Sequence, residues 1–203
     1  MTDGAGAIAE CVVTGVGPVT IDLAVVAKRA EPPGQPRIVV VQAVLKGDRG
    51  ELAVEIMTEV GVDAVVAWHA ERCVARWRAD RADKALARWR TTAREAAKQA
   101  RRPWIPEVTG PEATPAVARR VAAAELAVLL DPDAPTALAG VGMPDCGEIV
   151  VIVGPEGGVS QAEACSLADA GALAARLGPT VLRSSSAGAA AAALALAGSP
   201  RWA

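Results

Sequence analysis

Two turns near the C-terminus contain the residue types best suited to binding a small ligand. The first lies in Val153–Glu163, "VGPEGGVSQAE", directly after an apolar run. It contains three glycines, Gly154, Gly157 and Gly158. Glycine permits positive φ angles and lets a ligand approach the main chain closely. Ser160 and Glu163 have the spacing of a capping box, so a helix is predicted to begin after the turn. We interpret the stretch as a ligand-binding turn, against the alternative of a tight turn that binds nothing.

The second turn, Leu177–Arg183, has the sequence "LGPTVLR" and follows a predicted short strand. Arg183 stands at its end, shortly before the Ala-rich run 187–198. Alanine is the best helix former, so the run predicts a helix, with the serines at 184–186 as its N-cap residues.

These turns match none of the common nucleotide-binding or hydrolase signatures. The sequence lacks G-x-G-x-x-G and G-x-x-x-x-G-K-[ST], so a dinucleotide-binding fold and a P-loop have no specific support. It also lacks G-x-S-x-G, and a hydrolase triad would have to use the single histidine, His69. A phosphate or nucleotide bound by Gly154–Gly158 at a helix N-terminus is a weaker alternative.

The charge of the chain is unevenly distributed. The net charge is −2, yet residues 72–102 contain eleven basic and only three acidic residues, so this segment carries +8 and the remainder −10. The basic residues are Arg72, Arg76, Arg78, Arg81, Lys84, Arg88, Arg90, Arg94, Lys98, Arg101 and Arg102. Charge segregated in this way indicates a polyanionic partner at one place on the surface.

A helix predicted at residues 83–100 separates this charge from an apolar face. At 100° per residue one arc is basic and the opposite arc is apolar. The basic arc contains Lys84, Arg88, Arg90, Arg94, Lys98, Arg101 and Arg102. The apolar arc contains Ala85, Leu86, Trp89, Ala93, Ala96, Ala97 and Ala100. The pattern favours contact with RNA phosphates, against the alternative of a solvated charged face.

Strands and helices alternate from residue 37 onward. Strands are predicted at 37–44, 63–68, 125–130 and 148–153, and a further helix at 48–60, ended by Gly61. A short proline-flanked helix is expected between the last two strands. Continuous apolar runs are typical of strands buried on both faces, so the pattern favours an α/β domain with a parallel sheet.

The first thirty residues have a different pattern. Two short apolar segments separated by "TGVGP" predict a β-hairpin at Ala7–Ala27. A two-stranded hairpin is barely stable alone, so it must contact another part of the protein. "EPPGQP", residues 31–36, is interpreted as a linker and domain boundary.

Composition excludes several classes of protein. The four cysteines are scattered, which supports neither a disulfide framework nor a metal site, and we expect reduced thiols and no metal. The N-terminus has no secretory-signal pattern, and the apolar run 187–198 is too short to span a bilayer. A cytoplasmic protein without a membrane partner is expected.

The C-terminal motifs resemble those of the RsmE family of ribosomal RNA methyltransferases, in the SPOUT class. The family pattern is close to GPEGG-[FL]-S-x-x-E followed by LGxRILRxETA, and here it stands as "GPEGGVSQAE" and "LGPTVLRSSSA". Three further segments are similar to family motifs in the same order: "QAVLKGDRGELAVEIMTEVGVD", "AERCV" and "REAAKQARRPWIPEV". The resemblance covers about residues 36–200.

The resemblance implies a SPOUT-type α/β fold over residues 36–203, with a deep trefoil knot near 150–200. In that fold the two turns become two walls of a site for S-adenosylmethionine (SAM). The residues placed by resemblance at the cofactor are Val153, Gly154, Pro155, Gly157, Gly158, Leu177, Gly178, Leu182 and Ser184. Residues 1–33 would be the incomplete end of the family's PUA-like barrel. A homodimer is also expected.

The implied reaction is transfer of the SAM methyl group to N3 of a uridine in 16S rRNA of the small ribosomal subunit. Ionised uracil spreads negative charge to its carbonyl oxygens, which a guanidinium can hold with paired donors. Arg183 is the first choice for this catalytic role, against a purely structural arginine. Glu156 is a candidate base, or a residue that only orients the main chain and cofactor.

Family positions and the basic arc together suggest which residues face RNA. They are Lys46, Arg49, Arg72, Arg88, Arg94, Lys98, Gln99, Arg101 and Arg102. The chain departs from the family where "ETA" is replaced by "SSA" at 185–187, and in its incomplete N-terminal barrel. These departures leave open a second hypothesis, an RNA-binding protein of the same fold that has lost catalysis.

Overall fold

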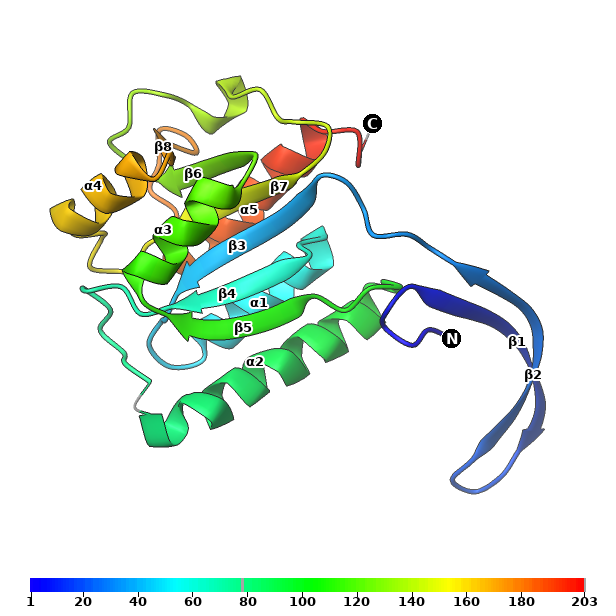
Figure 1. Ribbon diagram of the computed structural model, residues 1–203. Helices are drawn as coiled ribbons and strands as arrows, with labels where there is room; N and C mark the ends of the chain where they lie inside the picture. The colour runs from blue at the N-terminus through cyan, green and yellow to red at the C-terminus, as the bar shows by residue number, and fades with distance from the viewer. Residues whose placement is uncertain (78, 203) are drawn as a thin grey trace.

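The protein, described here as a computed structural model for residues 1–77 and 79–202, contains a six-stranded sheet of order β5-β4-β3-β7-β6-β8. All pairings in this sheet are parallel. The strands are β3 (Arg37–Ala43), β4 (Ala64–Trp68), β5 (Glu107–Glu112), β6 (Leu126–Leu130), β7 (Glu148–Val153) and β8 (Leu173–Ala175). Their carboxyl ends meet at one edge, on the left in Figure 1. The predicted α/β fold class with a parallel sheet is confirmed.

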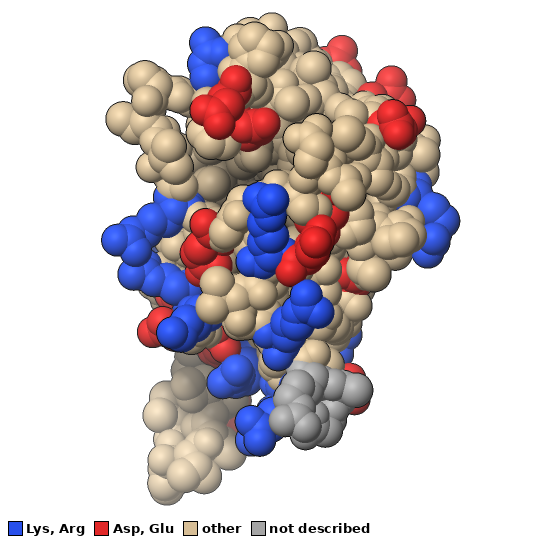
Figure 2. Space-filling view, turned by 90° about the vertical axis from the view of Figure 1, so that its left-hand side faces the viewer, with Lys and Arg blue, Asp and Glu red and all other residues tan. Residues whose placement is uncertain are grey.

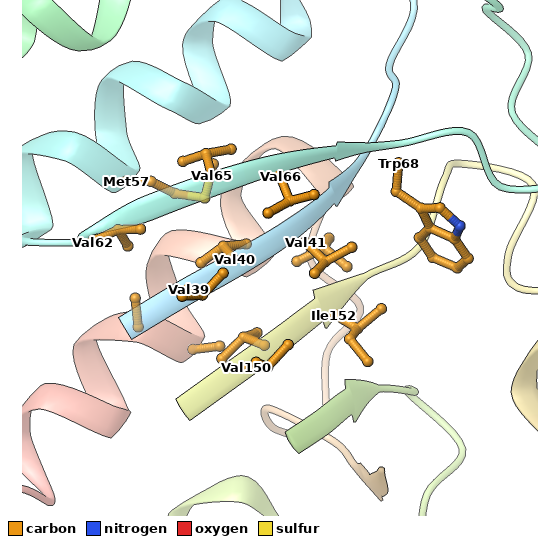
Figure 3. Packing of buried hydrophobic residues seen from close by; sticks show 14 of the residues in the cluster. Val39, Val40, Val41, Met57, Val62, Val65, Val66, Trp68, Val150 and Ile152 are labelled. Carbon is orange, nitrogen blue, oxygen red and sulfur yellow. The ribbon is translucent and has the colours of Figure 1, made fainter. Parts of the chain in front are cut away.

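The central strands owe their position to their sequence. β3, β4 and β7 consist almost entirely of Val, Ile and Ala and are buried on both faces. Figure 3 shows Val39, Val41 and Val150 among the side chains that fill the core around this sheet. Branched apolar side chains pack well on a pleated surface, so these runs form the middle of the sheet.

Helices cover both faces of the sheet (Figure 1). They are α1 (Arg49–Val60), α2 (Ala79–Gln99), α3 (Thr114–Ala123), α4 (Gln161–Asp169) and α5 (Ser184–Ala197), with a 3₁₀ turn η1 at Leu138–Gly140. α1 and α5 lie on one face, α3 and α4 on the other, and α2 packs against α1 and β5. Among the described residues, no helix is both long and apolar enough to cross a membrane.

Small residues let α5 approach the sheet closely. Eight of its residues are buried, six of them alanine or glycine. A Cβ atom on Gly188 would lie 2.9 Å from Sδ of Met57 and 3.2 Å from Cγ1 of Val40. No larger residue fits there without moving its neighbours. The Ala-rich run is therefore both a good helix former and a packing surface.

Several predicted boundaries need correction. Neither β5, which contains Gly110 and Pro111, nor α3 was predicted from the sequence, and α2 begins four residues earlier than predicted. The serines at 184–186 are not N-caps of α5, because the N-cap residue is Arg183 and the serines form the first helical turn. Ala100, placed on the apolar arc, follows the end of α2 and is exposed.

The predicted hairpin is confirmed as β1 (Ala7–Val16) paired antiparallel with β2 (Ile21–Ala30). Its base contacts the rest of the protein: the main-chain N–H of Gly6 donates to the carbonyl of Pro103 at 3.1 Å, and the indole of Trp104 donates to the carbonyl of Glu31 at 2.9 Å. Beyond that base the hairpin projects away from the sheet (Figure 1). The division into two domains and the knot near 150–200 stay predictions.

Candidate functional site

A cavity of about 660 Å³ lies at the carboxyl ends of β6 and β7. Four segments line it: the start of α1 with the residues before it, the loop after β6, the turn after β7, and the chain from Leu177 into α5. Most of its wall is apolar, including Leu45, Leu129, Val159 and Leu182. A cavity of this size and composition is typical of a small-molecule site.

The turn after β7 forms a fixed wall of this cavity. Ser160 is the N-cap of α4, and its side chain and that of Glu163 form the predicted capping box. Gly154 and Gly157 lie against protein, since a Cβ on Gly154 would be 2.7 Å from Cγ2 of Val159. Gly158 differs, with φ of +74° and no atom within 4 Å of the position a Cβ would take. The turn therefore requires glycine for two different reasons.

The segment 177–183 forms a second, more open wall. It is held at its start by Arg176, whose guanidinium donates to the carbonyls of Ala134, at 2.7 Å, and Pro135. The main chain of Arg176 also bonds Thr136 and Leu138. From Pro179 to Arg183 every residue is exposed. The two glycine turns do meet in space, as two walls of one cavity.

The loop after β6 forms a third wall, which sequence reasoning missed. Asp131, Pro132 and Asp133 line the cavity, and Oδ1 of Asp131 accepts the main-chain N–H of Asp133 at 2.9 Å. The signal that could have found it is position: the loop follows a buried strand at the carboxyl edge of a parallel sheet, where ligands bind.

The predicted cofactor residues are mostly brought together. Of the nine, eight line the cavity: Val153, Gly154, Pro155, Gly158, Leu177, Gly178, Leu182 and Ser184. Gly157 does not, because it lies against the main chain of Arg72, whose carbonyl oxygen would be 2.9 Å from a Cβ at this position. Its requirement for glycine thus comes from a neighbouring loop.

Both candidate catalytic residues line the cavity and are exposed. Within residues 1–77 and 79–202, the Arg183 guanidinium and the Glu156 carboxylate make no hydrogen bond or ion pair. The alternative of a structural Arg183 bonding internal carbonyls is therefore not supported. Arg49, expected to face RNA, also lines the cavity.

The comparisons with known proteins agree on one family. Residues 32–196 match the family model described as RNA methyltransferase domain. The chain is 43% identical over 191 residues to the ribosomal RNA small subunit methyltransferase E of Mycobacterium bovis, covering 92% of this chain and 73% of the relative. The chain belongs to the RsmE family. The Mycobacterium tuberculosis relative matches equally well.

Solved structures show the same architecture. A methyltransferase of Legionella pneumophila in complex with SAM superposes with a TM-score of 0.85 at 25% identity, covering 98% of this chain and 81% of that one. The RsmE protein of Neisseria gonorrhoeae, bound to SAM, gives 0.83 at 26% identity, covering 97% and 81%. The resemblance to RsmE and the SPOUT class is confirmed.

The cavity fits SAM on its own chemistry. The apolar walls suit the adenine and the aliphatic part of the methionine chain, and the open space beside Gly158 and Gly178 leaves their main chain accessible. Polar groups of the cofactor have Asp131, Asp133 and main-chain atoms of both turns within the same lining. In the part of the chain that the structure describes, no cluster of His, Cys, Asp or Glu could hold a metal ion.

The loop 69–77, next to the fixed wall, contains the only histidine. Nε2 of His69 accepts the main-chain N–H of Trp77 at 3.1 Å, which requires the neutral imidazole. Burial, and then the charge of Arg76, lower the pKa of His69 below its ordinary value. Burial raises the pKa of the Cys73 thiol, which favours its protonated form. Both side chains serve to shape the loop.

The basic surface predicted for RNA is present, but acidic residues lie within it and pair with some of its basic side chains. Figure 2 shows basic side chains gathered over the middle and lower part of one face, with acidic residues among them. Lys46, Arg72, Arg94, Gln99 and Arg101 are exposed. Arg88 and Lys98 are exposed as well, but pair with Glu51 at 3.3 Å and Glu95 at 2.8 Å. A prediction of RNA contact stands for these residues.

The prediction that Arg102 faces RNA is wrong. Its side chain is only 12% exposed and donates to the carbonyls of Thr58 and Val62 at 2.8 and 2.7 Å. It also pairs with Asp63 at 3.6 Å, and Asp63 is further bound by Arg201. Burial lowers the pKa of Arg102. The helical wheel placed Arg102 on the basic face of α2, but α2 ends at Gln99, so Arg102 does not lie on that helix.

Proposed function

We propose that this protein transfers the methyl group of SAM to N3 of a uridine in 16S rRNA of the small ribosomal subunit. Membership of the RsmE family supports SAM-dependent methylation of small-subunit rRNA. The observation that carries the proposal is that both glycine turns line one cavity, together with Arg183, whose guanidinium has no partner within the part of the chain that the structure describes.

The residues proposed to hold SAM are those that share the cavity from both turns. The main chain of Gly154, Gly158 and Gly178 offers close approach, and Val153, Leu177 and Leu182 offer apolar contact. The sulfonium of SAM supplies an already activated methyl group. The protein then has to place the uracil N3 in line with that methyl group and exclude competing orientations.

The Arg183 guanidinium is proposed to stabilise the ionised uracil. As the N3 proton leaves, negative charge spreads to the two carbonyl oxygens of the base, and paired N–H donors stabilise it in the transition state. Among the described residues the Arg183 guanidinium has no hydrogen-bond or ion-pair partner, so its donors are available for this role. Glu156 lines the same cavity and is proposed either to accept the N3 proton or to orient the turn.

The substrate RNA is proposed to bind on the exposed basic residues near this edge. Arg49 lies within the cavity lining, and Arg72 lies on the loop beside the fixed wall. Phosphate contacts from such residues fix the orientation of the RNA without reading its sequence. We further propose a homodimer in the cytoplasm, and that residues 1–33 belong to a PUA-like segment separate from the domain 36–203.

The experiment that tests the function is methylation of small ribosomal subunits lacking the modification. Purified protein, isotopically labelled SAM and subunits are incubated, and the rRNA is digested to nucleosides. We expect label in 3-methyluridine alone. Label in another nucleoside would contradict the proposed position, and no label despite SAM binding would favour the alternative of an RNA-binding protein that has lost catalysis.

A further inference from the structure

One carboxylate joins the cofactor turn to the loop that carries Arg72. Glu163, at the start of α4, is only 7% exposed and accepts hydrogen bonds on both oxygens. Oε2 accepts the main-chain N–H and the hydroxyl of Ser160, each at 3.2 Å. The first of these bonds is half of the capping box, and both join Glu163 only to the N-cap residue of its own helix.

The other oxygen of Glu163 binds two elements that are distant in sequence. Oε1 accepts the main-chain N–H of Glu71 at 2.9 Å and the hydroxyl of Thr114, at the start of α3, at 2.8 Å. The Thr114 hydroxyl in turn accepts the indole N–H of Trp68 at 3.2 Å. A helix cap alone does not require these contacts, so Glu163 has a second task.

A second hydrogen bond, from within the loop 69–77, holds the carbonyl of the same residue, Glu71. The carbonyl of Glu71 accepts a hydrogen bond from the Arg76 guanidinium at 3.0 Å. The next residue, Arg72, places its carbonyl against Gly157, where a Cβ would lie at 2.9 Å. Gly157 stands between two residues that line the cavity, Glu156 and Gly158. The main chain of Arg72 is thus set directly on the cofactor turn.

The side chain of Arg72 is free while its main chain is fixed. It is exposed, and among residues 1–77 and 79–202 its guanidinium makes no hydrogen bond or ion pair. A guanidinium held in this way can bind a phosphate at a set distance from the cofactor turn. By binding the main-chain N–H of Glu71, Glu163 holds the main chain from which the Arg72 side chain extends.

We propose that Glu163 is a positioning residue that sets the Arg72 loop relative to the cofactor turn, so that an RNA phosphate bound by Arg72 brings the target base to the methyl group. This inference rests on the proposed function. Its physical basis is a buried carboxylate with four donors, which holds three elements in one geometry.

The test compares Glu163→Ala with Ser160→Ala as its matched control. Both variants destroy the capping box, but only the first releases Glu71. We expect Glu163→Ala to weaken binding of the small subunit and to raise its KM about tenfold, against about twofold for Ser160→Ala, with kcat less affected than KM. Amide hydrogen exchange at Glu71 and Arg72 should accelerate in Glu163→Ala only.

A double-mutant cycle separates positioning from a general structural effect. If Glu163 acts through Arg72, then Glu163→Ala adds nothing to the KM or the subunit Kd of Arg72→Ala. Additive effects would overturn the inference, as would an unchanged KM in Glu163→Ala. If that variant does not fold, Gly157→Ala displaces the Arg72 carbonyl from the opposite side, and the same cycle and readouts apply.

The experiment distinguishes failure of the proposed function from failure of the role proposed for Glu163. If the protein with its original sequence transfers no methyl group, the proposed function is refuted. The double-mutant cycle would then be measured through the Kd for the small ribosomal subunit. Transfer by the unmodified protein together with additive variants would refute only the role of Glu163.

Discussion

The two glycine turns of the cavity differ in how they are held. In the turn after β7, Gly154 and Gly157 lie against Val159 and Arg72, and Glu163 binds the following helix to two other elements. In the turn after β8, Gly178 has no atom within 4 Å of a Cβ position, and residues 179–183 are exposed. Similar glycine signatures thus form a fixed wall and an open wall. The open wall ends at Arg183, whose guanidinium has no hydrogen-bond or ion-pair partner among the described residues.

Arg183→Ala, on the open wall, should have the largest effect. Removing a donor that stabilises transition-state charge typically lowers kcat by about 10²- to 10³-fold. Because the Arg183 guanidinium makes no hydrogen bond or ion pair with the described residues, we expect an unchanged melting temperature and an affinity for S-adenosylhomocysteine within about threefold of the original. Single-turnover methyl transfer measures the rate. Normal kcat with normal cofactor affinity would remove the catalytic role.

Gly178→Val should come next, as a test of the open wall alone. The branched side chain enters space beside the cavity without meeting protein, so stability should hold while cofactor affinity falls about tenfold, or about 1.4 kcal/mol. Gly142→Val is the matched control, because Gly142 also has open space but does not line the cavity. Calorimetric titration of both variants with S-adenosylhomocysteine measures the two affinities. Equal affinities would place the cofactor away from Gly178.

Thr114→Val, behind the fixed wall, should show the opposite balance. It removes one donor to Glu163 and leaves the indole of Trp68 without its acceptor, which typically costs about 1–3 kcal/mol of unfolding free energy. Cofactor affinity should change less than about threefold. Urea denaturation and titration measure the two quantities. A large loss of affinity without loss of stability would contradict the division between the walls.

Acidification should weaken the loop beside the fixed wall by a smaller amount. The pKa of His69 is lowered in the folded protein from an ordinary value of 6.5, so the unfolded chain binds the proton first as pH falls. The stability from neutral His69 is therefore complete above pH 6.5 and is lost as pH falls through the lowered pKa.

Unfolding free energies measured by urea denaturation between neutral pH and about pH 5 test this prediction. His69→Gln, which does not titrate, is the control. An equal pH dependence in both proteins would exclude His69 as the cause.

The sequence predicted the parts of this site that depend on local pattern. The Ser160–Glu163 capping box, the buried strand before Gly154 and the apolar face of α2 each follow from residue spacing. The two-wall cavity followed only from the family resemblance, because turns separated by α4 and β8 have no local signal that they meet.

What escaped prediction depends on contacts between distant elements. The cavity wall at Asp131–Asp133 is set by the position of β6 in the sheet. From the sequence, Arg102 is expected to offer its charge to RNA. In the structure its guanidinium instead donates hydrogen bonds to the carbonyls of Thr58 and Val62, at the end of α1 and just after it. Gly157 is required by the Arg72 loop rather than by the cavity. The positions of charged residues and glycines in the sequence do not reveal which distant residues they contact in the folded protein.

The central claim is that both turns form one SAM site, and calorimetric titration with S-adenosylhomocysteine tests it most directly. We predict one site per chain with a Kd in the micromolar range or below, about −8 kcal/mol or stronger, and competition by SAM. A folded protein that releases no heat and shows no competition would contradict the account.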